Sequence, residues 1–367
     1  MSMKLLLDAR AARQTADGIT RFSLNATRAL ERLRGQWKLS VLVHPSGCRH
    51  FEPLNVELVP CSVPRFVPGE NRRLIPLFRK LSPDVYLNYS MAGPTPENVP
   101  TLVTVHDLMV LSVPCYFGNG MIRNAISRKV FHNAILRSVQ HASAIAVPSA
   151  VTAREVRRRF PGAADKAFVT GEGQSLFAPG EGVVTGREAG PLLYVGNARA
   201  YKNLPRLLTA YGRVWAMNRG IPQMIMVVRR DRAFRGFKTH LDSNPARKNI
   251  SVVSDAGDQQ LRHLYLSCRG LVMPSVCEGF GLPALEAMAA GAPVMASRAT
   301  ALEELVGDAG LLVNPHSVID IARGVALLAR ADAGEIGRMG LAGMTRAAAF
   351  TWEKAANAFV SVIEGIA

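Results

Sequence analysis

The chain has 367 residues, of which 48% are hydrophobic and 20% charged. This length favours two domains, and the composition excludes an intrinsically disordered chain because apolar side chains are numerous enough to form two cores. The net charge of +16 is concentrated in residues 1–180, which hold 23 Lys and Arg against 12 Asp and Glu.

The basic first half predicts an anionic partner, with a membrane surface or a phosphorylated lipid as the leading candidates. Nucleic acid is not expected, because the basic residues are not interleaved with aromatic ones and no helix-turn-helix spacing occurs. Only three apolar residues run together before Asp8, too few for a signal peptide, and no run of ~18 apolar residues occurs anywhere. We therefore expect a cytoplasmic protein without a membrane span, peripheral at the inner face of the cell membrane.

Short apolar runs alternate with helical patterns along residues 1–172, which predicts a parallel α/β sheet. The expected strands are residues 4–8, 39–43, 56–59, 84–87, 101–105 and 144–147. Helices are expected at residues 21–33 and in a segment that Thr152 caps and that ends at Arg159. Gly18 lies where a βα loop meets the first helix. It either lets a phosphate or sugar approach the backbone or is a turn glycine with positive φ.

His106 follows the strand at residues 101–105. Ligands bind at this carboxyl edge of open parallel sheets, so we expect His106 to contact a ligand. Residues 71–81 and 123–137 mix basic and apolar side chains. Each stretch could lie in an anionic membrane interface, or it could be a surface helix that packs its apolar side on the core. Pro76 disfavours a long continuous helix in the first stretch.

Residues 173–190 are rich in glycine and other helix breakers, which predicts an interdomain linker. A second α/β series follows, with strands expected at residues 192–196, 224–228, 250–253, 270–274 and 293–296. Arg199 and Lys202 lie after the first of these strands, beside a helix that Asn203 could cap. Cations at such a place suit a diphosphate, although a solvated charged loop would have the same composition.

The most informative stretch is Ser275–Glu286. It places Glu278 and Glu286 eight positions apart around a glycine-rich turn, just before a helix that begins near Pro283. Unpaired main-chain N–H groups at a helix N-terminus favour a phosphate. The N–H groups expected there belong to Phe280, Gly281 and Leu282. The two carboxylates could accept hydroxyl groups of the same ligand.

With these motifs, the chain resembles the retaining GT-B glycosyltransferases of glycosyltransferase family 4, most closely bacterial mannosyl- and rhamnosyltransferases of surface-polysaccharide assembly. The resemblance covers most of the chain and is carried by Asp17–Phe22, Val105–Leu108 with Pro114 and Phe117, Ala146–Ser149, Tyr194–Asn197 with Lys202 and Asn203, Leu264 and Tyr265, Pro274–Pro293 and Glu304–Ala309. It implies two Rossmann-like domains whose parallel sheets face a cleft. Residues 1–172 would bind the acceptor, residues 191–350 would bind a nucleotide-sugar, and a terminal helix within residues 351–367 would cross back onto the first domain.

The resemblance assigns catalytic roles to His106, Glu278, Lys202 and Arg199, and donor binding to Gly18, Gly196, Phe280, Gly281, Leu282 and Glu286. Glu278 would hold hydroxyls of the donor sugar, and Glu286 would accept the ribose hydroxyls. Lys202 and Arg199 would neutralise the departing diphosphate, while His106 would touch the donor sugar from the other domain. Gly18 would line the acceptor or phosphate side.

The chain departs from the family at three places. Asp17-Gly18 stands where Gly-Gly is frequent, and Arg229-Arg230 follow the strand at residues 224–228 where a glycine is usual. The two arginines either add to the phosphate-binding charge or lie outside the site. Arg298, in a loop after the last of the expected strands, has no assigned role.

The implied reaction is retaining transfer of a hexose or deoxyhexose, with mannose or rhamnose favoured. The donor would be a nucleoside-diphosphate sugar, with GDP favoured, and the acceptor a lipid-linked or polysaccharide chain in bacterial surface glycan synthesis. No cofactor or metal is expected, because the chain has no Asp-x-Asp pair for Mg²⁺ and its five scattered cysteines lack the spacing of a zinc site.

Two alternatives remain open. One is a nucleotide-sugar epimerase of similar fold, against which the spacing of Glu278 and Glu286 argues. The other is a non-catalytic binding or scaffold subunit of GT-B shape, against which the presence of Glu278 and the diphosphate cations argues. We expect Glu278→Ala or Lys202→Ala to abolish transfer while the fold is kept.

Overall fold

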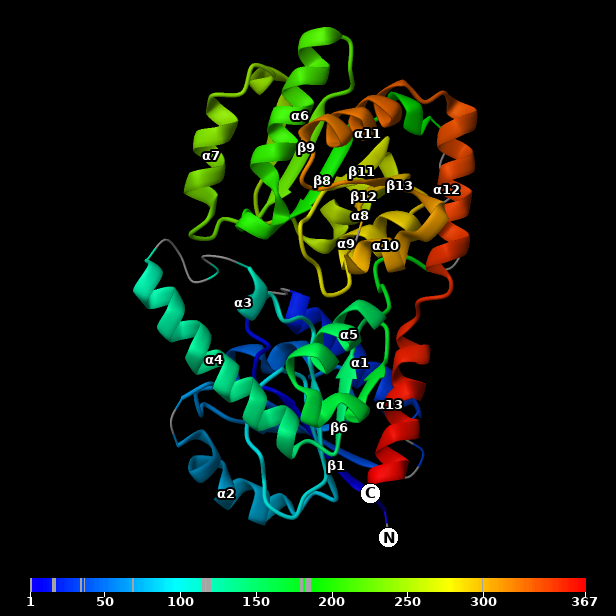
Figure 1. The fold of residues 1–367 in the computed structure, drawn as a ribbon. Coiled ribbons are helices and arrows are strands. Elements are labelled where there is room, and N and C mark those ends of the chain that lie inside the picture. Colours follow the sequence, from blue (N-terminus) through cyan, green and yellow to red (C-terminus); the bar gives the residue numbers. More distant parts are fainter. Residues whose placement is uncertain are drawn as a thin grey trace. The chain divides into compact units, whose positions relative to one another are not determined.

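The structure is a computed structural model that describes residues 2–14, 18–33, 35, 37–67, 69–113, 116, 120–178, 181, 186–298 and 300–367. Asp17, Pro114 and Phe117 of the motifs above, together with Cys115, lie outside the described residues. The chain divides into two compact units (Figure 1). One comprises Met1–Gly173 and Thr351–Ala367, and the other comprises Gln174–Phe350.

The first unit contains, among its described residues, a seven-stranded sheet in the order β3-β2-β1-β4-β5-β6-β7. Every neighbouring pair is parallel. The strands are β1 (Lys4–Ala9), β2 (Lys38–Val43), β3 (Glu57–Pro60), β4 (Val85–Asn88), β5 (Thr101–Thr104), β6 (Ala144–Val147) and β7 (Ala167–Val169). All residues of β4, β5 and β6 are buried, because helices cover both faces of a parallel sheet.

Helices of the first unit are α1 (Gly18–Leu33), α2 (Glu70–Leu81), α3 (Met109–Ser112), α4 (Met121–His141), α5 (Ala150–Arg159) and α13 (Trp352–Ile366), with short 3₁₀ segments η1 (Pro45–His50) and η2 (Pro161–Lys166). Figure 1 shows α13, in red, beside α1. The side chains of Phe359 and Ile363 are fully buried in the core that also holds Phe22 of α1. The predicted return of the terminal helix to the first unit is confirmed.

Two local predictions in the first unit were wrong. Ser149, and not Thr152, caps α5, because the Ser149 hydroxyl accepts the N–H of Thr152. Pro76 does not interrupt α2, which runs for 12 residues through it. A proline inside a helix costs about 3 kcal/mol. Burial of Leu74 and Phe78 against the core offsets this cost.

The second unit contains, within the described part of the chain, a six-stranded parallel sheet in the order β10-β9-β8-β11-β12-β13. Its strands are β8 (Leu192–Gly196), β9 (Met224–Val228), β10 (Ile250–Val253), β11 (Gly270–Met273), β12 (Val294–Ser297) and β13 (Leu311–Val313). Its helices are α6 (Leu204–Met217), α7 (Phe234–Asp242), α8 (Asp258–Ser267), α9 (Leu282–Ala289), α10 (Ala301–Val306), α11 (Val318–Arg330) and α12 (Ala333–Ala347), with 3₁₀ segments η3 (Arg187–Ala189), η4 (Ala200–Lys202), η5 (Arg247–Asn249) and η6 (Gly307–Ala309). The predicted α/β class with two parallel sheets is confirmed.

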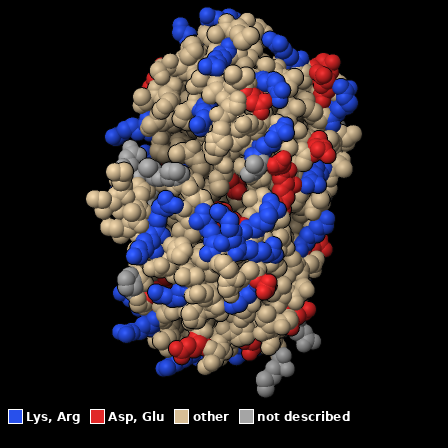
Figure 2. Space-filling model, in the orientation of Figure 1, with Lys and Arg blue, Asp and Glu red and all other residues tan. Residues whose placement is uncertain are grey.

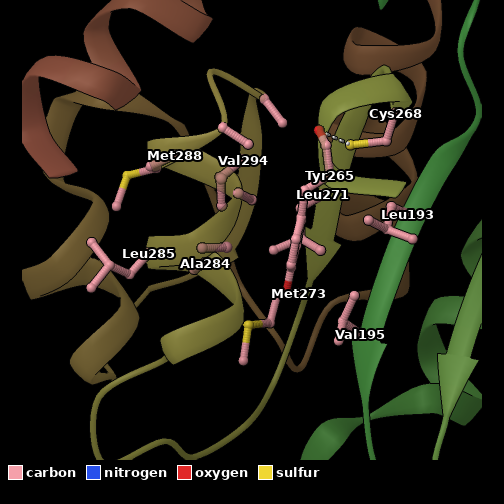
Figure 3. Close-up of a cluster of buried hydrophobic side chains, with 14 of the residues drawn as sticks. Leu193, Val195, Tyr265, Cys268, Leu271, Met273, Ala284, Leu285, Met288 and Val294 are labelled. Carbon is pink, nitrogen blue, oxygen red and sulfur yellow. Dashed lines mark hydrogen bonds between the residues drawn. The ribbon is translucent and has the colours of Figure 1, made fainter. Parts of the chain in front are cut away.

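Alternate residues of β8 enter two different cores, since successive side chains of a strand point to opposite faces. Leu192 and Tyr194 pack with residues of α6 and α11. Leu193 and Val195 pack with residues of α8 and α9 on the other side. Figure 3 shows the core on the side of α8 and α9, with Ala284 and Leu285 of α9 on one side of Leu271 of β11 and with Leu193 and Val195 of β8 on the other. The core therefore fixes α9 against the sheet.

The stretch predicted as a linker, residues 173–190, contributes packed side chains to the second unit from Gln174 onward. Phe177 is buried with a ring centroid 6.2 Å from that of Tyr265. Arg187 is also buried, and its guanidinium donates to the carbonyl groups of Tyr265, Cys268 and Ala290. These contacts hold the described part of the stretch against α8 and the end of α9.

Candidate active site

Lys202 and Glu278 form a buried ion pair at the carboxyl ends of two neighbouring strands. Lys202 ends η4 after β8, and Glu278 lies in the loop after β11. The distance from Lys202 Nζ to Glu278 Oε1 is 2.7 Å, and the side chains are 9% and 8% exposed. The fold therefore brings together two predicted site residues that are 76 positions apart.

Asn203 ties the loops of this ion pair together. Its backbone adopts φ 62°, and its side-chain amide donates to the carbonyls of Pro274 at 2.9 Å and Pro315 at 2.7 Å. The N–H of Val276 donates to the Tyr201 carbonyl at 2.7 Å. Asn203 occupies the N-cap position of α6 but makes no side-chain capping bond, so the predicted capping role was wrong. Its amide instead links the loop of Lys202 to the segments that follow β11 and β13.

The glycine-rich turn ends at the N-terminus of α9. Gly281 has φ 115°, and a Cβ there would lie 2.4 Å from Leu302 Cδ2, so both the backbone and the packing require glycine. The helix begins at Leu282, with Pro283 in its first turn as predicted. First-turn N–H groups lack acceptors within the helix, which makes this end of α9 suited to a phosphate. Phe280 is buried, with its ring 5.8 Å from that of Phe350.

Glu286 lies on α9 and is 6% exposed. The fully buried Tyr265 of α8 donates its hydroxyl to Glu286 Oε2 at 2.8 Å. A hydroxyl donor on one oxygen orients the carboxylate, and a carboxylate can accept more than one hydroxyl. Tyr265 belongs to a motif of the resemblance, but the sequence did not indicate this role, because its partner lies on another helix.

Gly196 and Arg199 are two further predicted site residues in the segment that leads to Lys202. A Cβ on Gly196 would lie 2.7 Å from the Tyr194 hydroxyl oxygen, so the absence of a side chain leaves room for this hydroxyl, whereas its distance of 3.6 Å from Lys202 Cε would be an ordinary contact. The Arg199 side chain is 47% exposed, with Nε 3.9 Å from a carboxylate oxygen of Asp231. An exposed pair at this distance is weak, so Arg199 can exchange Asp231 for another anion.

The three arginines without an assigned role lie on the surface of the second unit. The main-chain N–H of Arg229 donates to the Gly196 carbonyl at 3.2 Å, which places the backbone of Arg229 at the carboxyl edge of β8. Arg230 donates to the Ser254 hydroxyl at 3.0 Å, and Arg298 donates to the Leu312 carbonyl at 3.1 Å. Of the three, Arg229 is the one whose backbone contacts a residue of the predicted donor site.

In the first unit, His106 lies just beyond β5 with both ring nitrogens engaged. Nε2 donates to the Tyr89 carbonyl at 3.1 Å, and Nδ1 lies 3.6 Å from Glu172 Oε1. The ring packs edge-on against Phe22 at 4.4 Å. Burial alone would lower the pKa of His106, but the adjacent Glu172 carboxylate and the Tyr89 carbonyl outweigh it and raise that pKa. Sequence reasoning did not find Glu172, which lies in a loop rich in turn residues.

Gly18 is the first residue of α1 and is exposed. One alternative for Gly18 was a turn glycine with positive φ, but this angle depends on Asp17, which lies outside the described residues. A Cβ at this position would meet no atom of the described residues within 4 Å. Open space at the start of a helix is compatible with the other alternative, in which a phosphate or sugar approaches the backbone.

The charge of His106 should depend on Glu172. We expect Glu172→Gln to lower the pKa of His106 below its ordinary value of about 6.5, because burial would then act without the opposing carboxylate. In the wild type, the raised pKa stabilises the first unit at acidic pH, and this contribution is lost as pH rises through the folded-state pKa. NMR titration of the His106 ring proton measures both values, and an unchanged pKa in the variant would contradict the assignment.

Comparison with known proteins shows which families and relatives this chain resembles. Residues 188–335 match the family model for glycosyl transferases group 1. The chain is 29% identical to O-antigen chain mannosyltransferase B of Escherichia coli, with 73% of this chain and 72% of that protein covered. It is 38% identical to MMP alpha-(1->4)-mannosyltransferase of Mycolicibacterium hassiacum, but that match covers 31% of this chain and 29% of that protein.

The fold is shared with solved glycosyltransferase structures. Sucrose-phosphate synthase from Thermosynechococcus elongatus superposes with a TM-score of 0.78 at 19% identity, covering 99% of this chain and 98% of that one. At this identity the likeness concerns the fold alone. It agrees with the two parallel sheets described above. Residues 188–335 are therefore similar to the glycosyl transferases group 1 family, and the chain as a whole has the GT-B fold.

Proposed function

We propose that this glycosyltransferase moves a hexose or deoxyhexose, of the mannose or rhamnose type, from a nucleoside-diphosphate sugar with retention of the anomeric configuration. The observation that carries the proposal is the buried Lys202–Glu278 pair beside the N-terminus of α9. It combines a cation and helix N–H groups, which suit a diphosphate, with a carboxylate, which suits sugar hydroxyls.

The reaction breaks the bond between the sugar C1 and the diphosphate oxygen, and the bonding electrons leave with the nucleoside diphosphate. Lys202, Arg199 and the first-turn N–H groups of α9 stabilise that developing charge, which is the largest catalytic term for such a leaving group. The acceptor oxygen bonds to C1 on the same face, and its proton passes to the leaving phosphate oxygen. This assignment requires neither a metal nor another cofactor.

Glu278 and Glu286 have different duties in this proposal. Glu278 binds hydroxyls of the reacting sugar, and Lys202 holds its carboxylate in place before the donor arrives. Glu286, oriented by Tyr265, accepts the ribose hydroxyls. His106 contacts the donor sugar, and Gly18 lines the acceptor or phosphate side.

The acceptor in this proposal is a lipid-linked or polysaccharide chain of a bacterial surface glycan, and the enzyme works at the cytoplasmic face of the membrane. Two observations support it. The relative covered over most of its length is named an O-antigen chain mannosyltransferase. Residues 1–180 also hold nearly twice as many Lys and Arg as Asp and Glu, at 23 against 12. The resemblance to mannosyl- and rhamnosyltransferases favours GDP as the nucleotide.

Thermal unfolding with GDP-, UDP-, ADP- and dTDP-sugars tests the donor. A ligand at ~100 times its dissociation constant stabilises the folded state by roughly 2.7 kcal/mol, and we expect the GDP-sugar to give the largest shift in Tm. Glu286→Gln should weaken donor binding about tenfold, and Tyr265→Phe should weaken it less, since each perturbs one hydrogen bond at the ribose. No shift with any of the four donors would contradict the proposal, whereas donor-dependent epimerisation without transfer would favour an epimerase.

A further inference from the structure

The first half of α4 exposes a row of apolar side chains. Met121 is 84% exposed, Ile122 78%, Ile126 61% and Val130 56%. Ile122, Ile126 and Val130 are spaced four residues apart and therefore lie on one side of the helix. The large apolar side chains that α4 buries, Ile135 and Val139, belong to its second half, and the buried residue of its first half is the polar Asn124. The core of the first unit therefore leaves the apolar row of the first half uncovered.

The charged side chains of α4 around this apolar row are all basic. The 21 residues of α4 include no Asp or Glu, while they include Arg123, Arg128, Lys129 and Arg137. Arg123 and Lys129 are exposed beside the apolar row. Figure 2 shows Lys and Arg side chains gathered over α4 and α5, with few acidic side chains among them on this face. Such a surface is complementary to a partner that is both apolar and anionic.

The neighbouring aromatic residues extend the apolar row toward α2. The ring of Phe131 on α4 lies 5.3 Å from that of Phe66, which precedes α2 and is 40% exposed. The Arg65 guanidinium lies 4.8 Å from the centre of the Phe66 ring. Since this guanidinium donates to the Ala92 carbonyl and its Nε is buried, the Phe66 ring alone extends the exposed apolar row.

The basic-apolar stretches at residues 71–81 and 123–137 differ in how many large apolar side chains they expose. On α2, Leu74 and Phe78 are buried in the core, and the exposed side is formed mostly by polar and basic side chains such as Arg72 and Arg79. Only α4 presents a row of three or more exposed large apolar side chains among the described helices of the first unit. A helix that inserts into a lipid interface needs such a row, with long basic side chains reaching the phosphates at its sides.

We propose that Met121–Val130 of α4 inserts into an anionic lipid surface, with Phe66 at its edge and with α2 contributing charge alone. The proposal rests on the proposed function, because it identifies the element that would bring the enzyme to a lipid-linked acceptor. Arg123 and Lys129 attract the anionic headgroups, and the apolar row then enters the boundary between headgroups and acyl chains.

Sedimentation with lipid vesicles tests this inference in the full-length protein. Wild type should bind phosphatidylcholine vesicles that contain about 30% phosphatidylglycerol at least about tenfold more tightly than pure phosphatidylcholine, and the difference should shrink at high salt. The double variant Ile122→Asp, Ile126→Asp should lose about tenfold or more of the binding to anionic vesicles. Ile319→Asp is the matched control, because Ile319 is 74% exposed on α11 of the second unit.

Donor-induced shifts in Tm, measured on the same variants, separate this inference from the proposed function. The α4 variant should keep the donor response of the wild type, since none of its changed residues belongs to the donor site. Absence of wild-type binding to anionic vesicles, or equal losses in the α4 variant and the Ile319→Asp control, would overturn the inference and leave the donor test untouched. A missing donor response in the wild type would instead count against the proposed function.

Discussion

Glu278→Gln is expected to lower kcat by roughly 10²–10³-fold, the range seen when one preorganised polar contact to a transition state is removed. Glutamine keeps the size of the side chain and a carbonyl oxygen that can accept from Lys202 Nζ, but it removes the negative charge that faces the sugar. Steady-state kinetics with a GDP-sugar and an acceptor glycan measures the change. Glu286→Gln is the matched control, and it should act mainly on the KM for the donor.

The ion pair changes one expectation drawn from the sequence, namely that alanine substitutions would leave the fold intact. Removing one partner of a buried pair leaves the other charge without compensation, which destabilises a protein by about 3–5 kcal/mol. Lys202→Ala and Glu278→Ala should therefore lose stability as well as activity, and Glu278→Gln is the cleaner test. Near-normal turnover of the glutamine variant would contradict the role of Glu278, whereas unfolding of the alanine variants alone would not.

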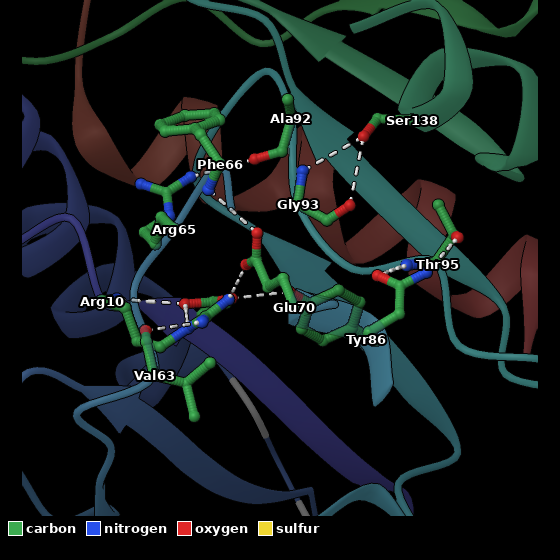
Figure 4. A network of polar contacts seen from close by, with 12 residues as sticks. Arg10, Val63, Arg65, Phe66, Glu70, Tyr86, Ala92, Gly93, Thr95 and Ser138 are labelled. Carbon is green, nitrogen blue, oxygen red and sulfur yellow. Dashed lines mark hydrogen bonds and ion pairs between the residues drawn. The ribbon is translucent and has the colours of Figure 1, made fainter. Parts of the chain in front are cut away.

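Arg10→Ala is expected to destabilise the first unit by about 3–5 kcal/mol at neutral pH, because it leaves the buried Asp8 carboxylate without its paired cation. Asp8 and Arg10 are each 1% exposed. The Arg10 guanidinium lies 2.6 Å from an oxygen of Asp8 and 2.7 Å from one of Glu70, and the Tyr86 hydroxyl donates to Asp8 at 2.6 Å. Figure 4 shows Arg10 and Tyr86 within this network, with Glu70 reaching it from α2.

The loss should depend on pH in a defined direction. Burial alone would raise the pKa of Asp8, but Arg10 outweighs it and lowers that pKa below its ordinary range. The contribution to stability is therefore present above the unfolded-state pKa of about 3.9 and is lost as pH falls through the lower folded-state pKa. Without Arg10, burial would raise the pKa of Asp8, so the variant would regain relative stability in acid.

Urea unfolding of wild type and Arg10→Ala at neutral and acidic pH measures this dependence. Arg72→Ala is the matched control, because Arg72 is exposed on α2, and it should change stability by no more than about 0.5 kcal/mol. The same destabilisation by Arg10→Ala at both pH values would show that the network does not act through the charge of Asp8.

The sequence by itself determined the features that arise from local patterns. Short apolar runs predicted β6, β8 and β9 with the bounds that the structure has, because a strand buried on both faces is a continuous apolar segment. The bounds of β10 were also predicted, although its Ser251 is exposed. The turn before α9 was also predicted from the sequence. A glycine at the helix start, followed by proline, is a local signal that does not depend on the rest of the fold.

Tertiary structure decided which side chains are partners. Lys202 meets Glu278 because β8 and β11 are neighbours in the sheet. The order of the strands in a sheet cannot be predicted from any single segment of the sequence. Tyr265 and Glu286 meet because one core holds α8 and α9 together. His106 meets Glu172 because β5, β6 and β7 are neighbours in the first sheet, so that the segments after β5 and β7 lie at the same edge.

Burial was the other property that only the fold could assign. The stretches at residues 71–81 and 123–137 have similar mixtures of basic and apolar side chains. The core accepts the apolar side of α2 and leaves that of the first half of α4 uncovered. A hydrophobic pattern states that a face is apolar, but the free energy of burying it depends on whether another element lies opposite, and that is a property of the assembled fold.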